Sequence, residues 1–110
     1  MLNNEVRYRI LRLLTVNPEI SQRGVARELG ISLGKVNFCL RALVQKGLVK
    51  AANFRNSENK IAYMYLLTPR GIEEKTRVTL RFLQQKTLEY EALKVEIEEI
   101  RREVGVADRV

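Results

Sequence analysis

The sequence has no histidine and no tryptophan, and it contains one cysteine among its 110 residues. Without histidine the chain can build neither a Ser-His-Asp triad nor a metal site with imidazole ligands. A single cysteine excludes an internal disulfide and a CxxC zinc motif. No Gly-rich phosphate loop and no carboxylate pair in a plausible cleft is evident either. We therefore expect a protein that is not an enzyme and that uses no metal or cofactor.

Long apolar runs are also missing. No segment approaches the roughly 18–20 apolar residues that span a bilayer. The charged start, residues 1–10, lacks the apolar core of a signal peptide. The composition, 45% hydrophobic and 30% charged, is typical of one folded domain. The expected location is the cytoplasm, without contact to a membrane.

Basic residues dominate the first part of the chain. Residues 1–70 hold 12 Lys/Arg against 4 Asp/Glu, whereas residues 71–110 hold 8 against 9. A concentrated basic surface favours a polyanionic partner, although it can also serve only to solvate a small protein.

Three short helices are predicted within the first 47 residues. Apolar spacing indicates one over residues 3–16, which Pro18 ends. Ser21 and Ser32 are good N-caps for two further helices, which reach Leu29 and about Lys46. The residues expected to be buried are Val6, Ile10, Leu13, Leu14, Val25, Ala26, Leu29, Val36, Cys39, Leu40 and Leu43. For Cys39 the alternative is a redox sensor.

A change of pattern after Gly47 predicts a β-hairpin. Residues 48–55 and 60–67 are rich in β-branched, aromatic and aliphatic residues, and turn formers occupy 56–59. Tyr63 and Tyr65 are expected in the core, and the alternative is a platform on which nucleobases stack. Thr68-Pro69 is then a specific signal for the start of another helix.

No strong breaker interrupts the chain from Pro69 to about Val104, so this segment predicts one long helix. Heptad spacing from Ile72 gives a seam that is weak at Thr76, Thr79 and Lys86 and apolar in its last five positions. A partner helix would cover it, and we expect a homodimer. The alternatives are a lone solvated helix or a docking surface for another protein. The residues expected in the dimer contact are Leu83, Tyr90, Leu93, Ile97, Ile100 and Val104.

The order of helix, helix, helix, hairpin and helix is that of a winged helix-turn-helix. Within residues 22–41, Ala26 allows two helices to approach, Gly30 suits the turn and Val36 takes a later apolar position. We predict a mainly α fold with a small hairpin wing. Residues 1–68 would form the DNA-binding domain, and residues 69–110 a coiled-coil-like dimerisation helix.

The outward face of the third helix contains the candidates for base contacts. Arg41 suits guanine, Asn37 suits adenine and Phe38 can touch a thymine methyl. Packing of Phe38 against the hairpin is the alternative. The expected base-contacting set is Ser32, Gly34, Asn37, Phe38 and Arg41.

Candidates for contacts to the DNA backbone surround this face. They include two helix N-termini and the basic tip of the hairpin. The alternative for the hairpin is that its charges only keep an exposed edge soluble. The expected set is Ser21, Gln22, Arg23, Lys35, Arg55, Asn56, Asn59 and Lys60.

Three runs, residues 21–32, 43–49 and 65–71, together resemble winged helix-turn-helix regulators of the MarR type. Residues 32–37 and 63–75 are more similar to the small MarR-family regulators associated with exopolysaccharide (EPS) genes. The resemblance implies a homodimeric, DNA-binding transcriptional regulator with residues 32–46 as recognition helix and 54–61 as wing. The chain departs from the usual MarR pattern in having one long C-terminal helix in place of a pair, and it indicates no particular small-molecule effector.

We therefore expect a sequence-specific regulator that binds double-stranded DNA. The other class that fits the sequence is a winged-helix adaptor that docks a different protein through its heptad helix.

Overall fold

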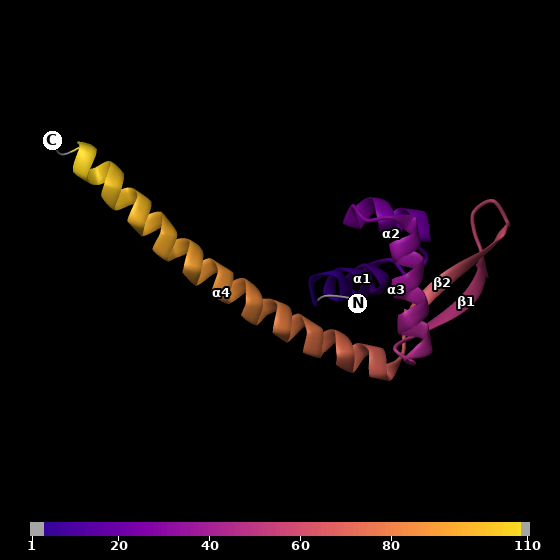
Figure 1. The fold of residues 1–110 in the computed structure, drawn as a ribbon. Coiled ribbons are helices and arrows are strands. Elements are labelled where there is room, and N and C mark those ends of the chain that lie inside the picture. Colours follow the sequence, from indigo (N-terminus) through magenta and orange to yellow (C-terminus); the bar gives the residue numbers. More distant parts are fainter. Residues whose placement is uncertain (1–3, 109–110) are drawn as a thin grey trace.

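The computed structural model describes residues 4–108, with side chains through Gly105. Helices α1 (Asn4–Val16), α2 (Gln22–Leu29) and α3 (Leu33–Gln45) precede an antiparallel hairpin of β1 (Val49–Arg55) and β2 (Ile61–Leu67). A long helix, α4 (Pro69–Asp108), completes the chain (Figure 1). This confirms the predicted fold class. The start of the first helix at residue 3 lies outside the described residues.

Local capping explains where the short helices begin and end. The Ser21 hydroxyl accepts the backbone N–H of Gly24 at 3.0 Å, and the Ser32 hydroxyl accepts that of Lys35 at 3.1 Å. Gly30 ends α2 with φ 66°, in the left-handed region that glycine adopts without strain. These signals were all in the sequence.

The core lies between α1, α2, α3 and the base of the hairpin. Leu11 is as fully buried as the predicted Ile10, because α1 contacts α2, β2 and α4 on different sides. Val6 and Leu13, by contrast, are only partly buried. The buried cluster is Ile10, Leu11, Leu14, Val25, Val36, Cys39, Leu40, Leu43, Leu48, Val49 and Tyr65.

The hairpin leaves the core halfway along its length. Val49 pairs with Leu67 at the buried end, and Arg55 pairs with Ile61 near the tip. Tyr65 is buried, but Tyr63 is 63% exposed. The expectation of a core position for Tyr63 was therefore wrong: both tyrosines share one face of β2, but only the residue closer to the helices is covered.

A tight joint connects α3, the hairpin and α4. The Thr68 hydroxyl donates to the carbonyl of Gly47 at 2.6 Å and accepts the N–H of Gly71 at 3.1 Å. A Cβ atom on Gly71 would overlap the carbonyl oxygen of Leu48. Only glycine permits the start of α4 to approach β1 this closely.

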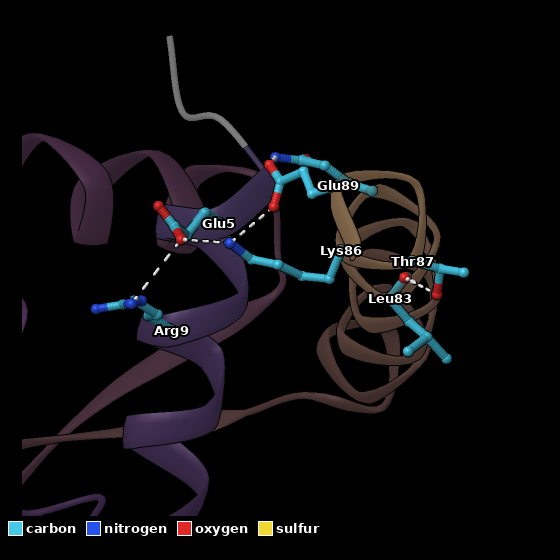
Figure 2. Close-up of polar contacts among 7 residues, drawn as sticks. Glu5, Arg9, Leu83, Lys86, Thr87 and Glu89 are labelled. Carbon is cyan, nitrogen blue, oxygen red and sulfur yellow. Dashed lines mark hydrogen bonds and ion pairs between the residues drawn. The ribbon is translucent and has the colours of Figure 1, made fainter. Parts of the chain in front are cut away.

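The first part of α4 packs on α1. Val78 is fully buried, and the rings of Tyr8 and Phe82 stack with centroids 4.7 Å apart. At the far end of this contact, Lys86 lies 3.7 Å from Glu5 (Figure 2). The predicted boundary at residue 69 thus falls where α4 begins, while the packing of α4 on α1 continues to about Lys86.

From Leu83 to Val104 every side chain of α4 is exposed, and Figure 1 shows the helix running away from the other elements. The molecule is accordingly elongated, with extents of 71 × 29 × 22 Å. Within residues 4–108, no helix combines the length and apolar character needed to cross a membrane.

Candidate nucleic-acid interface

The outer face of α3 is exposed over its full length. Its residues Gly34, Asn37, Phe38 and Arg41 lie on the side opposite the buried Val36, Cys39, Leu40 and Leu43, as the helical repeat requires. Ser32, at the start of the helix, is exposed as well. The structure thus brings all five predicted base-contacting residues onto one surface.

Phe38 is 59% exposed, so the alternative that it packs against the hairpin is wrong. A large aromatic side chain left in water has an energetic cost that a partner can remove. Lys35 is exposed at the edge of the same helix.

A polar relay links α2, α3 and the hairpin. Gln22 Nε2 donates to the hydroxyl of Tyr65 at 3.0 Å, and Asn37 Nδ2 donates to Gln22 Oε1 at 3.3 Å. Gln22, predicted to contact the DNA backbone, therefore orients Asn37 in the free protein. The bond leaves Asn37 Oδ1 as an acceptor. Tyr65 was missed as a site residue because nothing local in the sequence shows that it reaches Gln22.

A hollow of about 350 Å³ lies between α3 and the hairpin. Arg41 of α3 and Tyr63 of β2 both line it. The exposed α3 face and the middle of the hairpin therefore border one hollow. The lining residues are Gln22, Asn37, Leu40, Arg41, Val44, Gln45, Ala51, Tyr63 and Tyr65.

The tip of the hairpin is built by its asparagines. Asn56 Oδ1 accepts the backbone N–H groups of Glu58 at 2.9 Å and Lys60 at 3.0 Å, and Asn59 has φ 61°. The Arg55 guanidinium donates to the carbonyl of Asn59 at 3.0 Å. Asn56 and Asn59, predicted as contacts to the DNA backbone, thus shape the turn that presents the charged side chains.

Exposed cations surround the α3 face. Arg23 follows the N-terminus of α2, Lys35 lies in the first turn of α3, and Arg55 and Lys60 flank the wing tip. Glu58, 3.5 Å from Lys60, offsets part of the charge at the tip. The Ser21 and Ser32 hydroxyls act as N-caps, so any anion at these helix ends would meet backbone N–H groups.

The single cysteine belongs to the hydrophobic core. Cys39 is fully buried on the inner face of α3, and this burial raises the pKa of its thiol while nearby Lys35 partly lowers it. A protonated, buried thiol behaves as a small apolar side chain, which disfavours the redox alternative. Among the described residues, no group of three or more Cys, Asp or Glu side chains could hold a metal ion.

Three packed helices, an exposed third helix and a two-stranded wing define a winged helix-turn-helix fold. Residues 3–50 match the family model described as winged helix-turn-helix DNA-binding. Comparison with curated proteins gives no match.

Solved structures of transcriptional regulators share the fold over most of the chain. The PcaV regulator of Streptomyces coelicolor is 20% identical, with a TM-score of 0.64 over 96% of this chain and 79% of that one. The adhesin competence repressor AdcR of Streptococcus pyogenes is 20% identical (TM-score 0.63; 92% and 76% covered). A MarR/EmrR family regulator of Acinetobacter sp. ADP1 is 21% identical (TM-score 0.55; 89% and 73% covered). The resemblance to MarR-type proteins is confirmed at the level of the fold.

Proposed function

We propose that this protein is a MarR-type transcriptional regulator that binds double-stranded DNA sequence-specifically as a homodimer. The observation that carries the proposal is the outer face of α3, where Asn37, Phe38 and Arg41 are exposed and where a hollow shared with the hairpin adjoins Asn37 and Arg41. An exposed helix of this kind fits the major groove. The DNA-binding description of the matching family model supports the same function.

Each residue of the α3 face has a distinct role in this proposal. Arg41 donates in bidentate fashion to guanine, and Asn37 pairs with adenine after releasing Gln22. Phe38 contacts a thymine methyl, whereas Gly34 allows the helix backbone to approach the groove. Ser32 contacts the first base edge from the helix N-terminus.

Contacts to phosphates hold the helix in register. Arg23 and Lys35 contact the strand beside α3, while Arg55 and Lys60 bring the wing to the adjacent groove. Ser21, Gln22 and Asn56 take part mainly by shaping the surface, since their side chains form hydrogen bonds within the protein. Asn59 shapes the wing tip through its backbone, which has φ 61° and accepts a hydrogen bond from Arg55.

The dimer contact is proposed along α4. Its apolar side chains beyond the α1 contact are exposed in the single chain, and a second copy would bury them. The residues involved are Leu83, Tyr90, Leu93, Ile97, Ile100 and Val104.

We further propose that the regulated genes direct exopolysaccharide synthesis. The support is the similarity of residues 32–37 and 63–75 to the EPS-associated regulators.

Selection of bound sequences from a random DNA pool tests the DNA-binding proposal. We expect enrichment of a palindromic site with half-sites about 34–36 Å, one helical turn, or a multiple of this apart. Equal affinity for selected and random DNA at several salt concentrations would contradict sequence-specific binding.

Light scattering tests the homodimer, with two substitutions in α4 as a matched pair. Ile97→Glu places a charge on the apolar stripe and should give a monomer, whereas Val95→Glu, on another side of the helix, should leave the dimer intact. A wild-type chain that is monomeric alone and associates only with a different protein would favour the adaptor alternative.

A further inference from the structure

We propose that α4 pairs with α4 of a second copy as a parallel two-stranded coiled coil over residues 90–104, with its direction set by flanking charges. The inference rests on the homodimer of the proposed function and adds the orientation of the two chains. It is carried by the positions of charged residues on either side of the exposed apolar stripe.

The position of α1 explains where the seam begins. On α4, α1 covers Val78 and Phe82 and ends at the contact between Glu5 and Lys86 (Figure 2). The weak seam positions Thr76, Thr79 and Lys86 therefore lie along the part of α4 that α1 accompanies. A second copy would cover Leu83, which is exposed beside this contact, and the stripe beyond Lys86, where it becomes apolar without interruption.

The apolar stripe has most of the residue types of a two-stranded coiled coil. In heptad notation Tyr90, Ile97 and Val104 occupy a positions, and Leu93 and Ile100 occupy d positions. β-branched residues at a, with leucine at d, favour two parallel strands. Ile97, Leu93 and Val104 follow this rule, whereas Tyr90 and Ile100 depart from it. All five side chains are between 38% and 58% exposed in the single chain, so pairing would remove a continuous apolar surface from water.

Acidic residues flank one side of the stripe, and basic residues flank the other. The g positions are all acidic: Glu89, Glu96 and Glu103. The two e positions inside the seam are basic: Lys94 and Arg101. Glu89 lies 3.1 Å from Lys86 and accepts a hydrogen bond from Gln85 within the same helix, and these contacts lower the pKa of its carboxyl.

In a parallel pair, each g residue faces the e residue five positions further along the other chain. Glu89 would face Lys94, and Glu96 would face Arg101, and twofold symmetry repeats both contacts. In an antiparallel pair, g faces g and e faces e, so that Glu would meet Glu and Lys would meet Arg. The charge pattern therefore stabilises one direction and opposes the other.

The basic residues are available for this role. Lys94 lies 3.9 Å from Glu91, and Arg101 lies 3.3 Å from Glu98, in exposed pairs within the same helix. Such surface pairs contribute little to stability, so exchanging them for contacts across the seam costs little.

The direction matters for DNA binding. A parallel seam holds both winged helices at the same end of the coiled coil, where one duplex can reach them together. An antiparallel seam would place them at opposite ends of an elongated particle.

Disulfide trapping in the full-length protein distinguishes the two directions. Tyr90 occupies an a position and Ile100 a d position, 10 residues apart, or about 15 Å along the helix. In a parallel seam a faces a and d faces d, whereas in an antiparallel seam a faces d. For a parallel seam, Tyr90→Cys and Ile100→Cys should therefore each form a disulfide-linked homodimer under mild oxidation. Cross-linking only in a mixture of the two variants would overturn the proposal. Native Cys39 is buried, and the wild-type protein controls for its reaction.

A charge reversal beside the seam provides an independent test of the direction, because it should weaken a parallel dimer and strengthen an antiparallel one. Glu96→Lys turns two attractive contacts into repulsive ones in the parallel dimer and should weaken dimerisation about tenfold, measured by analytical ultracentrifugation without DNA. Glu99→Lys makes the same change of charge away from the seam and should have little effect. Tighter association of Glu96→Lys would overturn the parallel direction, and a wild-type monomer would overturn the homodimer itself. Both readouts are independent of whether the protein binds DNA.

Discussion

At the scale of single residues, three glycines of helices α3 and α4 meet different surroundings. A Cβ on Gly71 would overlap the Leu48 carbonyl, whereas Cβ atoms on Gly34 and Gly105 would meet no atom within 4 Å. The same substitution should therefore have opposite consequences at different positions.

Gly71→Ala should destabilise the protein by about 3 kcal/mol, because the joint between β1 and α4 must open to admit the methyl group. Gly105→Ala, in the same helix, should be neutral or stabilising by up to about 1 kcal/mol, since alanine is the better helix former. Urea denaturation of both variants measures the difference. Equal stability of the two would contradict the close approach at Leu48.

Gly34→Ala should raise the stability of the protein and lower its affinity for DNA. Open space around Gly34 predicts a gain of about 0.5–1 kcal/mol in the free energy of unfolding, as expected for an alanine in a helix. If the backbone of α3 approaches DNA here, affinity should nevertheless fall by about tenfold or more, about 1.4 kcal/mol. Unchanged affinity in fluorescence anisotropy would place the contact elsewhere on α3.

Arg41→Ala should change the preference for one base, whereas Lys60→Ala should change the affinity for every DNA sequence. Loss of a bidentate contact at Arg41 should cost about 1–3 kcal/mol and relax preference at one base position. Loss of a phosphate contact at Lys60 should weaken binding to all sequences and reduce the salt slope by about 1. Titration of the selected site and of single-base variants at several salt concentrations measures both effects.

At the scale of elements, the contact of α1 with α4 depends on a half-buried ion pair. Arg7 and Glu74 lie 3.5 Å apart with side chains 17% and 16% exposed, and the buried Arg7 Nε has no hydrogen-bond partner. Replacing Glu74 alone leaves the Arg7 guanidinium mostly buried and poorly compensated, whereas replacing Arg7 alone leaves Glu74 with Arg77, 3.5 Å away.

Glu74→Met should destabilise the protein by about 1–3 kcal/mol, and the double variant Arg7→Met, Glu74→Met should be less destabilised than the sum of the single changes. Chemical denaturation of the four proteins in this double-mutant cycle measures the coupling. Simple additivity would show that the ion pair contributes nothing to the packing of α1 on α4.

Elements marked by local chemistry were predictable from the sequence. Ser21, Gly30 and Ser32 delimit the helices, and Thr68 caps α4 as expected. The burial of Leu11 was not predictable, because it depends on which elements surround α1. The relay through Gln22 was missed for the same reason, since its partners lie 15 and 43 positions away in the sequence.

For the candidate interface, too, some features were predictable from the sequence and others were not. Helical periodicity was sufficient to place Asn37, Phe38 and Arg41 on an exposed face of α3. It could not show that Asn56 and Asn59 hold the wing tip in shape, because that depends on the turn geometry of the folded hairpin. The contacts of these residues with DNA remain predictions.

At the scale of the whole molecule, stability should differ between the two halves of α4. The first part of α4 packs on α1 and β2, whereas the side chains of residues 87–104 are all exposed and depend on the proposed partner for cover. Hydrogen exchange should therefore be slow in residues 90–104 of the wild-type dimer and fast in Ile97→Glu, with residues 4–86 alike in both. Equal protection of residues 90–104 in both proteins would contradict stabilisation by pairing.

The joint at the base of α4 has a mechanical consequence. The Thr68 hydroxyl donates to the carbonyl of Gly47, two residues after α3 ends, and Gly71 lies directly against Leu48, so the start of α4 is fixed to the end of α3. A rotation of α4 would therefore carry α3 with it. In the proposed dimer, any change in the angle at which the two α4 helices cross would move both α3 helices at once. The separation of the half-sites is then a property of the coiled coil and the joint, and it can change without alteration of any residue that contacts DNA.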